Sequence, residues 1–298
     1  MEFKLENHPF LHYTNICGQT CIQSDNYLSA PRCILFFTGN PSLLAFYIDF
    51  CEMLHEQYPD DSILVVSLHC TPMNNVFPSW KTSLYEVIKV KLNLIDWVLR
   101  ELPQTTHFLL LTHSLGAFVA LHVLPQRPEL EHRVDQIIHL FPAIRDLKHS
   151  IDLIVRLLAR LTLIYPLISM TTYLLKLLPL FIFTLFIQLV STTPPQQAKM
   201  MQQDLNPHHI AQVAYFTLDE EEVITDHDKQ TQECLLKTSN KTTVVFGQFD
   251  KYTPLWIRNE FKERYPDVRV IETTIKHAFV LGKSKEMFDF LKQNNVFL

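Results

Sequence analysis

Glycine is scarce in this 298-residue chain, which contains five glycines where an average soluble domain has about 7%. Glycine adopts positive φ and lets backbone segments approach closely, so a chain with so few is expected to keep them where little else fits. Three of the five, Gly39, Gly116 and Gly247, follow predicted strands and lie beside the candidate chemistry described below.

The chain also has no excess of basic residues: it contains 26 Lys and Arg and 31 Asp and Glu, which gives a net charge of −5. There is therefore no surplus of positive charge to neutralise phosphates, which argues against nucleic acid as a partner. Charged residues make up 19% of the chain, apolar residues 47%, and the mean hydropathy is +0.06. Intrinsic disorder is excluded, and an excess of apolar surface is expected somewhere in the molecule.

The six cysteines form neither paired C-x-x-C knuckles nor the framework of a small disulfide-rich domain. Free thiols in a reducing compartment are therefore expected, with no metal and no cofactor. The N-terminal residues MEFKLENHPF carry charges and lack an apolar run of signal-peptide length, which predicts a protein made in the cytosol.

Buried strands alternate with helices along most of the chain. Strands are predicted at 32–38, 62–68, 107–111, 134–141, 241–246 and 268–271, and helices at 43–57, 82–101, 114–124, 254–264 and 284–293. This alternation is typical of βαβ units and predicts an α/β fold with a mostly parallel sheet.

The strongest motif is Thr112-His113-Ser114-Leu115-Gly116, which joins the 107–111 strand to the next helix. A serine on a sharp strand-to-helix turn between small residues is the nucleophile elbow G-x-S-x-G. Ser114 occupies the nucleophile position, and Thr112 replaces the first glycine. The alternative is that Ser114 only caps the helix, since serine is a favoured N-cap residue.

A serine nucleophile needs a histidine late in the chain, and His277 is the one histidine after the last predicted strand. The other candidates have simpler interpretations. His113 is predicted to fill space at the elbow, His139 to pack within a strand, and His208 and His209 to begin a helix.

The acid of such a triad lies between the serine and the histidine, after a strand. Asp250 follows the 241–246 strand, with Gly247 opening its loop, and is predicted to orient His277. Loop capping by Asp250 is the alternative. Asp219 and the run 220–222 are rival acids, although an acidic run usually forms a solvated face.

An oxyanion hole requires two backbone N–H groups, one from the residue after the nucleophile and one from an early strand-to-helix loop. Leu115 is the first predicted donor. In Gly39-Asn40-Pro41 the proline has no N–H, so Asn40 is the second, although G-N-P by itself is also a simple turn signal.

Residues 146–196 interrupt the α/β pattern with an apolar insertion between core segments 1–145 and 197–298. Its most apolar part, 177–190, would be roughly 21 Å long as a helix, shorter than a hydrocarbon core of about 30 Å. Lys176 and Pro179 oppose a longer span. The insertion is therefore predicted to lie in a lipid surface, to act as a lid over the active site, or to do both.

Together, the G-N-P loop, the H-S-L-G elbow, the apolar insertion, Asp250 and His277 resemble the lipid-droplet-associated hydrolases over roughly residues 30–295. The resemblance implies an α/β-hydrolase fold with helices on both faces of the sheet and an apolar helical cap. It also implies a Ser114–Asp250–His277 triad, attachment to lipid droplets and the cytosolic face of the endoplasmic reticulum, and lipid or sterol ester hydrolysis. The sequence departs from the pattern at Ser42, where relatives have glycine, and at Thr112.

Two functions follow from these observations. The first is a serine ester hydrolase acting on sterol esters or acylglycerols at a droplet surface. The second is a droplet-binding organiser of lipid storage whose triad is weak or vestigial.

Overall fold

The computed structural model describes residues 3–4, 10–68, 82–150, 157, 160–161, 164–190, 195–226 and 228–297. Its centre is a nine-stranded sheet of order β1-β2-β3-β5-β4-β6-β7-β8-β9. The strands are β1 (Phe3–Lys4), β2 (Leu11–Ile16), β3 (Gln19–Ser24), β4 (Arg32–Phe37), β5 (Ser62–Val66), β6 (His107–His113), β7 (Val134–Leu140), β8 (Thr242–Gly247) and β9 (Arg269–Thr273).

The sheet is parallel from β5 to β9, and its other end, β1 to β3, is antiparallel and pairs with β5. The α/β-hydrolase fold is thus confirmed, with each predicted strand present to within a few residues. The β2–β3 hairpin was not predicted from the sequence. Its turn uses Cys17 and Gly18, both at positive φ.

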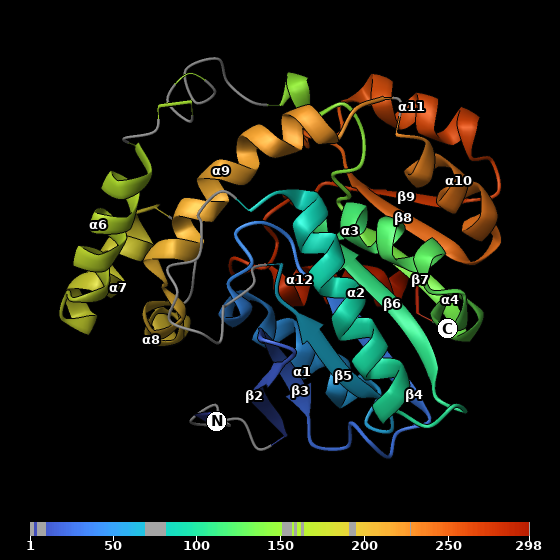
Figure 1. Ribbon diagram of the computed structural model, residues 1–298, viewed down its shortest axis with the longest axis horizontal. Coiled ribbons are helices and arrows are strands. Elements are labelled where there is room, and N and C mark those ends of the chain that lie inside the picture. Colours follow the sequence, from blue (N-terminus) through green and yellow to red (C-terminus); the bar gives the residue numbers. More distant parts are fainter. Residues whose placement is uncertain are drawn as a thin grey trace.

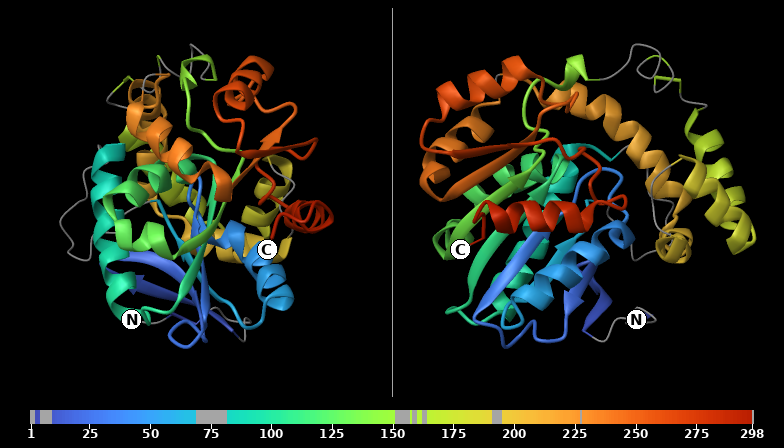
Figure 2. Two further views of the ribbon diagram at one scale, coloured as in Figure 1. Left: turned by 90° about the vertical axis from the view of Figure 1, so that its right-hand side faces the viewer. Right: turned by 180° about the vertical axis from the view of Figure 1, so that it is seen from behind.

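Helices cover both faces of the sheet because β4, β5 and β6 are apolar on both sides. Along β4, Cys33, Leu35 and Phe37 face one core, while Ile34 and Phe36 face the other. The first core contains α2 (Leu84–Glu101), α3 (Leu115–Val123), α4 (Pro128–Arg133), α10 (Lys229–Thr238) and α11 (Leu255–Arg264). The second contains η1 (Leu44–Tyr47), α1 (Ile48–Gln57) and α12 (Ser284–Gln293), and both α1 and α12 lie in front in the rear view of Figure 2.

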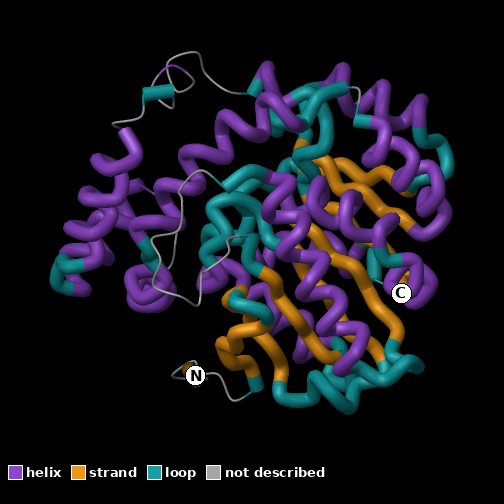
Figure 3. The backbone as a smooth tube through the Cα atoms, in the orientation of Figure 1, coloured by secondary structure: helices purple, strands orange, loops and turns teal. Residues whose placement is uncertain are grey.

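Between β7 and β8 the chain forms a group of helices outside these layers. They are α6 (Ile164–Lys176), α7 (Leu180–Val190), α8 (Pro195–Asp204) and α9 (Pro207–Val223), preceded by the short η3 (Leu147–His149). Figures 1 and 3 show α6, α7 and α8 together beside the sheet, with α9 running from them toward α11. The division at 146 and 196 stays a prediction, and residue 196 lies within α8. Within the described ranges, every helix is too short or too polar to cross a membrane.

Candidate active site

Ser114 lies on a sharp turn between β6 and α3. Its backbone has φ 53° and ψ −124°, a conformation that costs a non-glycine residue on the order of 1–3 kcal/mol. The turn is held by Ser114 N–H donating to Leu140 O at 3.0 Å and by Ser114 O accepting from Ala117 and Ala143, each at 3.1 Å. Ser114 occupies the N-cap position of α3, but its side chain makes no capping hydrogen bond. The helix-cap interpretation therefore does not account for this serine.

The elbow brings α3 into contact with the end of β4, and Gly116 makes that approach possible. A Cβ on Gly116 would lie 2.4 Å from Phe37 O and 2.5 Å from Thr38 O, so no side chain fits there. At the other side of the serine, the Thr112 hydroxyl lies 2.7 Å from Nδ1 of His139 on the neighbouring strand. The replacement of the first motif glycine by threonine is thus accommodated by a buried hydrogen bond to β7.

Ser114, His277 and Asp250 are joined by hydrogen bonds. His277 Nε2 lies 2.9 Å from Ser114 Oγ, and His277 Nδ1 lies 2.7 Å from Asp250 Oδ2. The three residues follow β6, β8 and β9, whose carboxyl ends meet at one edge of the sheet. Since a carboxylate can only accept, Nδ1 carries the proton toward Asp250, which leaves Nε2 to accept from the serine hydroxyl.

The loop after β8 supports this arrangement at two points. Tyr252 N–H donates to the second carboxylate oxygen of Asp250 at 3.0 Å, and the Tyr252 ring packs on His277 with centroids 4.7 Å apart. The Asp250 side chain is 1% exposed, whereas that of His277 is 20% exposed. The carboxylate is therefore shielded from water while the imidazole remains accessible.

His113 is more than the space-filling residue expected from the sequence. Burial and the neighbouring His277 lower the pKa of His113 to about 3, so its ring is neutral. Nε2–H donates to the backbone oxygen of His277 at 3.0 Å, and Nδ1 accepts from the Tyr47 hydroxyl at 2.8 Å. The Tyr47 oxygen in turn accepts from Gly39 N–H at 2.8 Å. This chain of bonds ties the loop after β4 to the backbone of the His277 loop.

The Gly39-Asn40-Pro41 loop lies against the elbow. A Cβ on Gly39 would be 2.8 Å from Ser114 Cβ, and the Asn40–Pro41 peptide is cis. Leu115 is the first residue of α3, so its N–H has no partner within the helix. For both Asn40 and Leu115, no acceptor among the described residues takes the backbone N–H. Both predicted donors are thus unpaired, and they lie next to residues of the elbow: Leu115 follows Ser114, and Asn40 follows Gly39, which lies against Ser114.

The acidic run in α9 corrects another expectation, because two of its three glutamates are buried and only Glu222 is exposed. Glu220 and Glu221 are 8% and 7% exposed, and the Asp219 carboxylate accepts from Leu84 N–H at 2.6 Å. Glu220 accepts from Asn40 Nδ2 at 3.1 Å, so this carboxylate contacts the G-N-P loop rather than His277. Neither Tyr47 nor Glu220 lies in a sequence motif. Their place at the site is seen only from contacts with residues far away in the sequence.

The family model for "Lipid-droplet associated hydrolase" matches residues 30–280. The chain belongs to this family. It is similar to curated lipid droplet-associated hydrolases from Gallus gallus, at 27% identity over 89% of this chain and 85% of the relative, and from Homo sapiens, at 25% over 92% and 88%. The Dictyostelium discoideum relative is 23% identical over 85% of this chain and 84% of its own length.

Solved structures similar to this family member support the fold. A carboxylesterase from the thaumarchaeon Nitrososphaera gargenis superposes with a TM-score of 0.63 at 14% identity, over 95% of this chain and 97% of the other. The haloalkane dehalogenase DatA from Agrobacterium tumefaciens gives 0.62 at 13% identity, over 95% and 96%. At such low identity these structures establish the α/β-hydrolase fold and nothing about the reaction.

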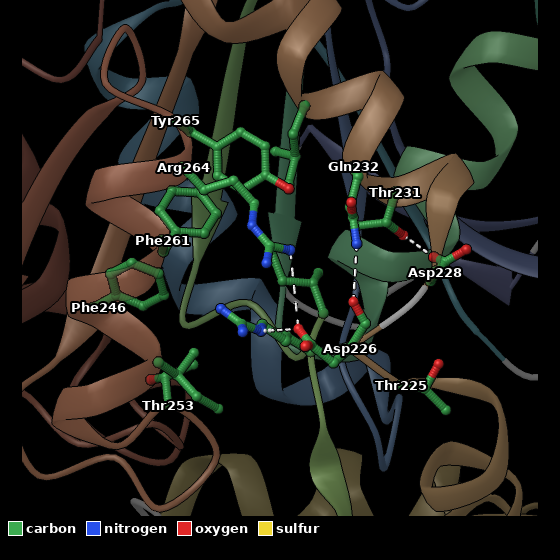
Figure 4. Close-up of a pocket in the computed structure, with 14 residues that line it drawn as sticks. Thr225, Asp226, Asp228, Thr231, Gln232, Phe246, Thr253, Phe261, Arg264 and Tyr265 are labelled. Atoms are coloured by element: carbon green, nitrogen blue, oxygen red, sulfur yellow. Dashed lines mark hydrogen bonds and ion pairs between the residues drawn. The ribbon is translucent and has the colours of Figure 1, made fainter.

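A small, partly open cavity lies apart from the Ser114 site (Figure 4). Its volume is about 20 Å³, room for about one water molecule. Arg145 is one of its lining residues and pairs with Asp226 and Glu260, and Arg264 also approaches Asp226. None of Ser114, Asp250 and His277 lines this cavity, which is too small for an ester substrate. Within the described residues, no group of His, Cys, Asp or Glu side chains is arranged to hold a metal ion.

Proposed function

We propose that this protein is a serine ester hydrolase that acts on hydrophobic lipid esters, of the sterol ester or acylglycerol class, at the surface of lipid droplets. The observation that supports this most is the hydrogen-bonded series Ser114–His277–Asp250 on an elbow with positive φ at the serine. Membership of the family supports a hydrolase. The class of ester is part of what we propose.

In the proposed reaction Ser114 Oγ attacks the ester carbonyl carbon while His277 Nε2 takes the hydroxyl proton. Asp250 stabilises the resulting imidazolium, and the N–H groups of Asn40 and Leu115 donate to the oxyanion. The intermediate collapses, His277 returns its proton to the departing alcohol, and an acyl-serine remains. Water, deprotonated by His277, then attacks the acyl group, and His277 returns the proton to Ser114 Oγ as the carboxylic acid is released.

The droplet surface is proposed from the apolar side chains of α6 and α7. In α7, Phe183 is the one side chain among those described that is fully buried, whereas Phe181 is 67% and Leu189 86% exposed. The exposed apolar side chains of this pair of helices are Leu167, Met170, Tyr173, Leu174, Leu177, Leu180, Phe181, Ile182, Leu185, Phe186 and Leu189. So many exposed apolar side chains on two helices favour a contact with lipid, and inserting a few of them would yield several kcal/mol.

The same surface favours the second candidate, a droplet-binding organiser of lipid storage, because α6 and α7 could bind lipid whether or not Ser114 reacts. Attachment to the cytosolic face of the endoplasmic reticulum stays a prediction from the family resemblance. So does a lid role for the insertion.

The experiment that tests the enzyme is labelling of the purified full-length protein with a fluorophosphonate, followed by mapping of the modified residue. We expect modification of Ser114 and none in Ser114→Ala, which should also lose ester turnover by several orders of magnitude. Ser29→Ala, at an exposed serine, serves as the matched control and should behave as the parent. A parent protein that is folded, is not labelled and turns over no ester would overturn the proposal in favour of the organiser.

A further inference from the structure

The carboxyl-terminal part of α9 contacts the loop after β4. Glu220 Oε1 accepts a hydrogen bond from Asn40 Nδ2 at 3.1 Å, although 180 positions separate the two residues in the chain. The other polar atom of this side chain, Asn40 Oδ1, is buried without a hydrogen-bond partner among the described residues. Glu220 is therefore the one polar contact of the Asn40 side chain within the described part of the molecule.

Glu220 occupies an unfavourable environment for a carboxyl group. Its side chain is buried, and no described lysine, arginine or histidine forms an ion pair with it. Burial is the main cause that raises the pKa of Glu220 to about 8, and the Asn40 hydrogen bond opposes this shift. A leucine or methionine would fill this space at lower cost, so the carboxyl group calls for a role beyond packing.

An oxyanion donor stabilises the transition state because it is already held in place when the negative charge develops on the substrate oxygen. In this loop the Gly39 N–H is tied to Tyr47, and Pro41 has no N–H, so the backbone supplies no further anchor for Asn40. A side chain fixed at its end restrains the peptide that carries it. The contact with Glu220 therefore limits rotation of the Asn40 peptide, which follows Gly39, the residue that lies against Ser114.

We propose that Glu220 is a positioning residue, whose carboxyl oxygen holds the Asn40 side chain and thereby keeps the Asn40 N–H directed at the oxyanion. This inference rests on the proposed function, because it assigns Asn40 the donor role described there. Glu220 belongs to α9, and α9 also contacts α6. The proposal therefore connects the helices between β7 and β8 to the active site. The contacts between α9 and α6 are Ser169 Oγ to Pro207 O at 3.2 Å and the Tyr165 and Tyr215 rings, 6.2 Å apart.

The test uses the full-length protein and a short-chain chromogenic ester, with kcat and KM determined separately. Glu220→Ala should lower kcat about tenfold to hundredfold, less than the loss of a whole oxyanion donor, and leave KM within about twofold. Glu220→Gln keeps an oxygen that accepts from Asn40 Nδ2 and should retain kcat within about twofold. Glu222→Ala, at an exposed position of the same helix, is the matched control and should equal the parent.

Asn40→Ala tests the contact from the other side, because it removes the side chain and keeps the backbone N–H. It should reproduce the kcat loss of Glu220→Ala, and the double variant should be no slower than either single variant. This second variant also decides the question if Glu220→Ala fails to fold, as judged by circular dichroism and Tm.

The inference is overturned if the parent is active and Glu220→Ala and Asn40→Ala retain its kcat. It is equally overturned if Glu220→Gln is as slow as Glu220→Ala, or if the two losses multiply in the double variant. A parent that neither reacts with a fluorophosphonate nor turns over ester would instead refute the proposed function, and this inference with it.

Discussion

The Tyr47 hydroxyl lies 2.8 Å from His113 Nδ1 and also accepts the Gly39 N–H, so one side chain connects the G-N-P loop to the elbow. The direction of each bond follows from chemistry. The His113 ring is neutral, and its Nε2–H must face the His277 carbonyl, which leaves Nδ1 to accept.

Tyr47→Phe removes both bonds of the hydroxyl at once. A buried Gly39 N–H and a buried His113 nitrogen then lack partners, which should destabilise the fold by about 1–3 kcal/mol. We expect kcat to fall about tenfold with KM little changed, as measured on a soluble ester at a temperature well below Tm. As a control, Tyr85→Phe alters an exposed tyrosine. Unchanged kcat and Tm in Tyr47→Phe would contradict this assignment.

His277 and Asp250 should lose activity as a unit. Each single substitution to alanine is expected to lower kcat by several orders of magnitude, with Asp250→Ala the less severe. The double variant should be about as slow as His277→Ala, because Asp250 acts only through the imidazole. Losses that multiply would show that the two side chains serve separate roles.

The apolar side chains of α7 should hold the protein on lipid. Phe181→Asp with Leu185→Asp places two carboxylates one helical turn apart on exposed positions, which leaves the core intact and opposes insertion. Flotation with phospholipid-coated triacylglycerol droplets should recover the parent and Ser114→Ala but not this double variant. Leu236→Asp changes an exposed leucine on α10 and should float as the parent does. A folded double variant that still floats would place the attachment elsewhere.

The stability of the protein should depend on pH through Glu220. Its pKa is raised from 4.5 to about 8 in the folded chain, so the folded state binds a proton that the unfolded state releases across this range. The protonated form favours folding, and stability contributed by Glu220 is present below pH 4.5 and declines as the pH rises toward 8. Glu220→Gln removes this dependence.

The Tm of Glu220→Gln relative to the parent should therefore increase from pH 5 to pH 8 and level off above it. Thermal unfolding of both proteins in matched buffers measures this difference. A constant Tm difference across the range would mean that the Glu220 carboxyl titrates normally.

Ser42 and Thr112, the two departures from the family pattern, are both buried and hydrogen-bonded. Thr112 bonds His139, and Ser42 Oγ accepts from Leu68 N–H at 2.6 Å and lies 3.0 Å from Ser67 Oγ. These contacts connect the departures to neighbouring strands and loops without touching the Ser114–His277 bond.

The sequence by itself determined the fold class, because apolar strands alternating with helices carry a local signal that needs no tertiary contact. It also placed Ser114, Asp250 and His277 as candidates, since strand ends in a parallel sheet meet at one edge. Only the tertiary structure decided that Glu220 is buried against Asn40 and that Tyr47 and His113 join two loops. Those contacts link residues 66 to 180 positions apart, and helix α9 buries Glu220 and Glu221, which belong to an acidic run that its composition alone assigns to solvent. Burial of a charged side chain depends on what the fold brings against it, and no local pattern encodes that partner.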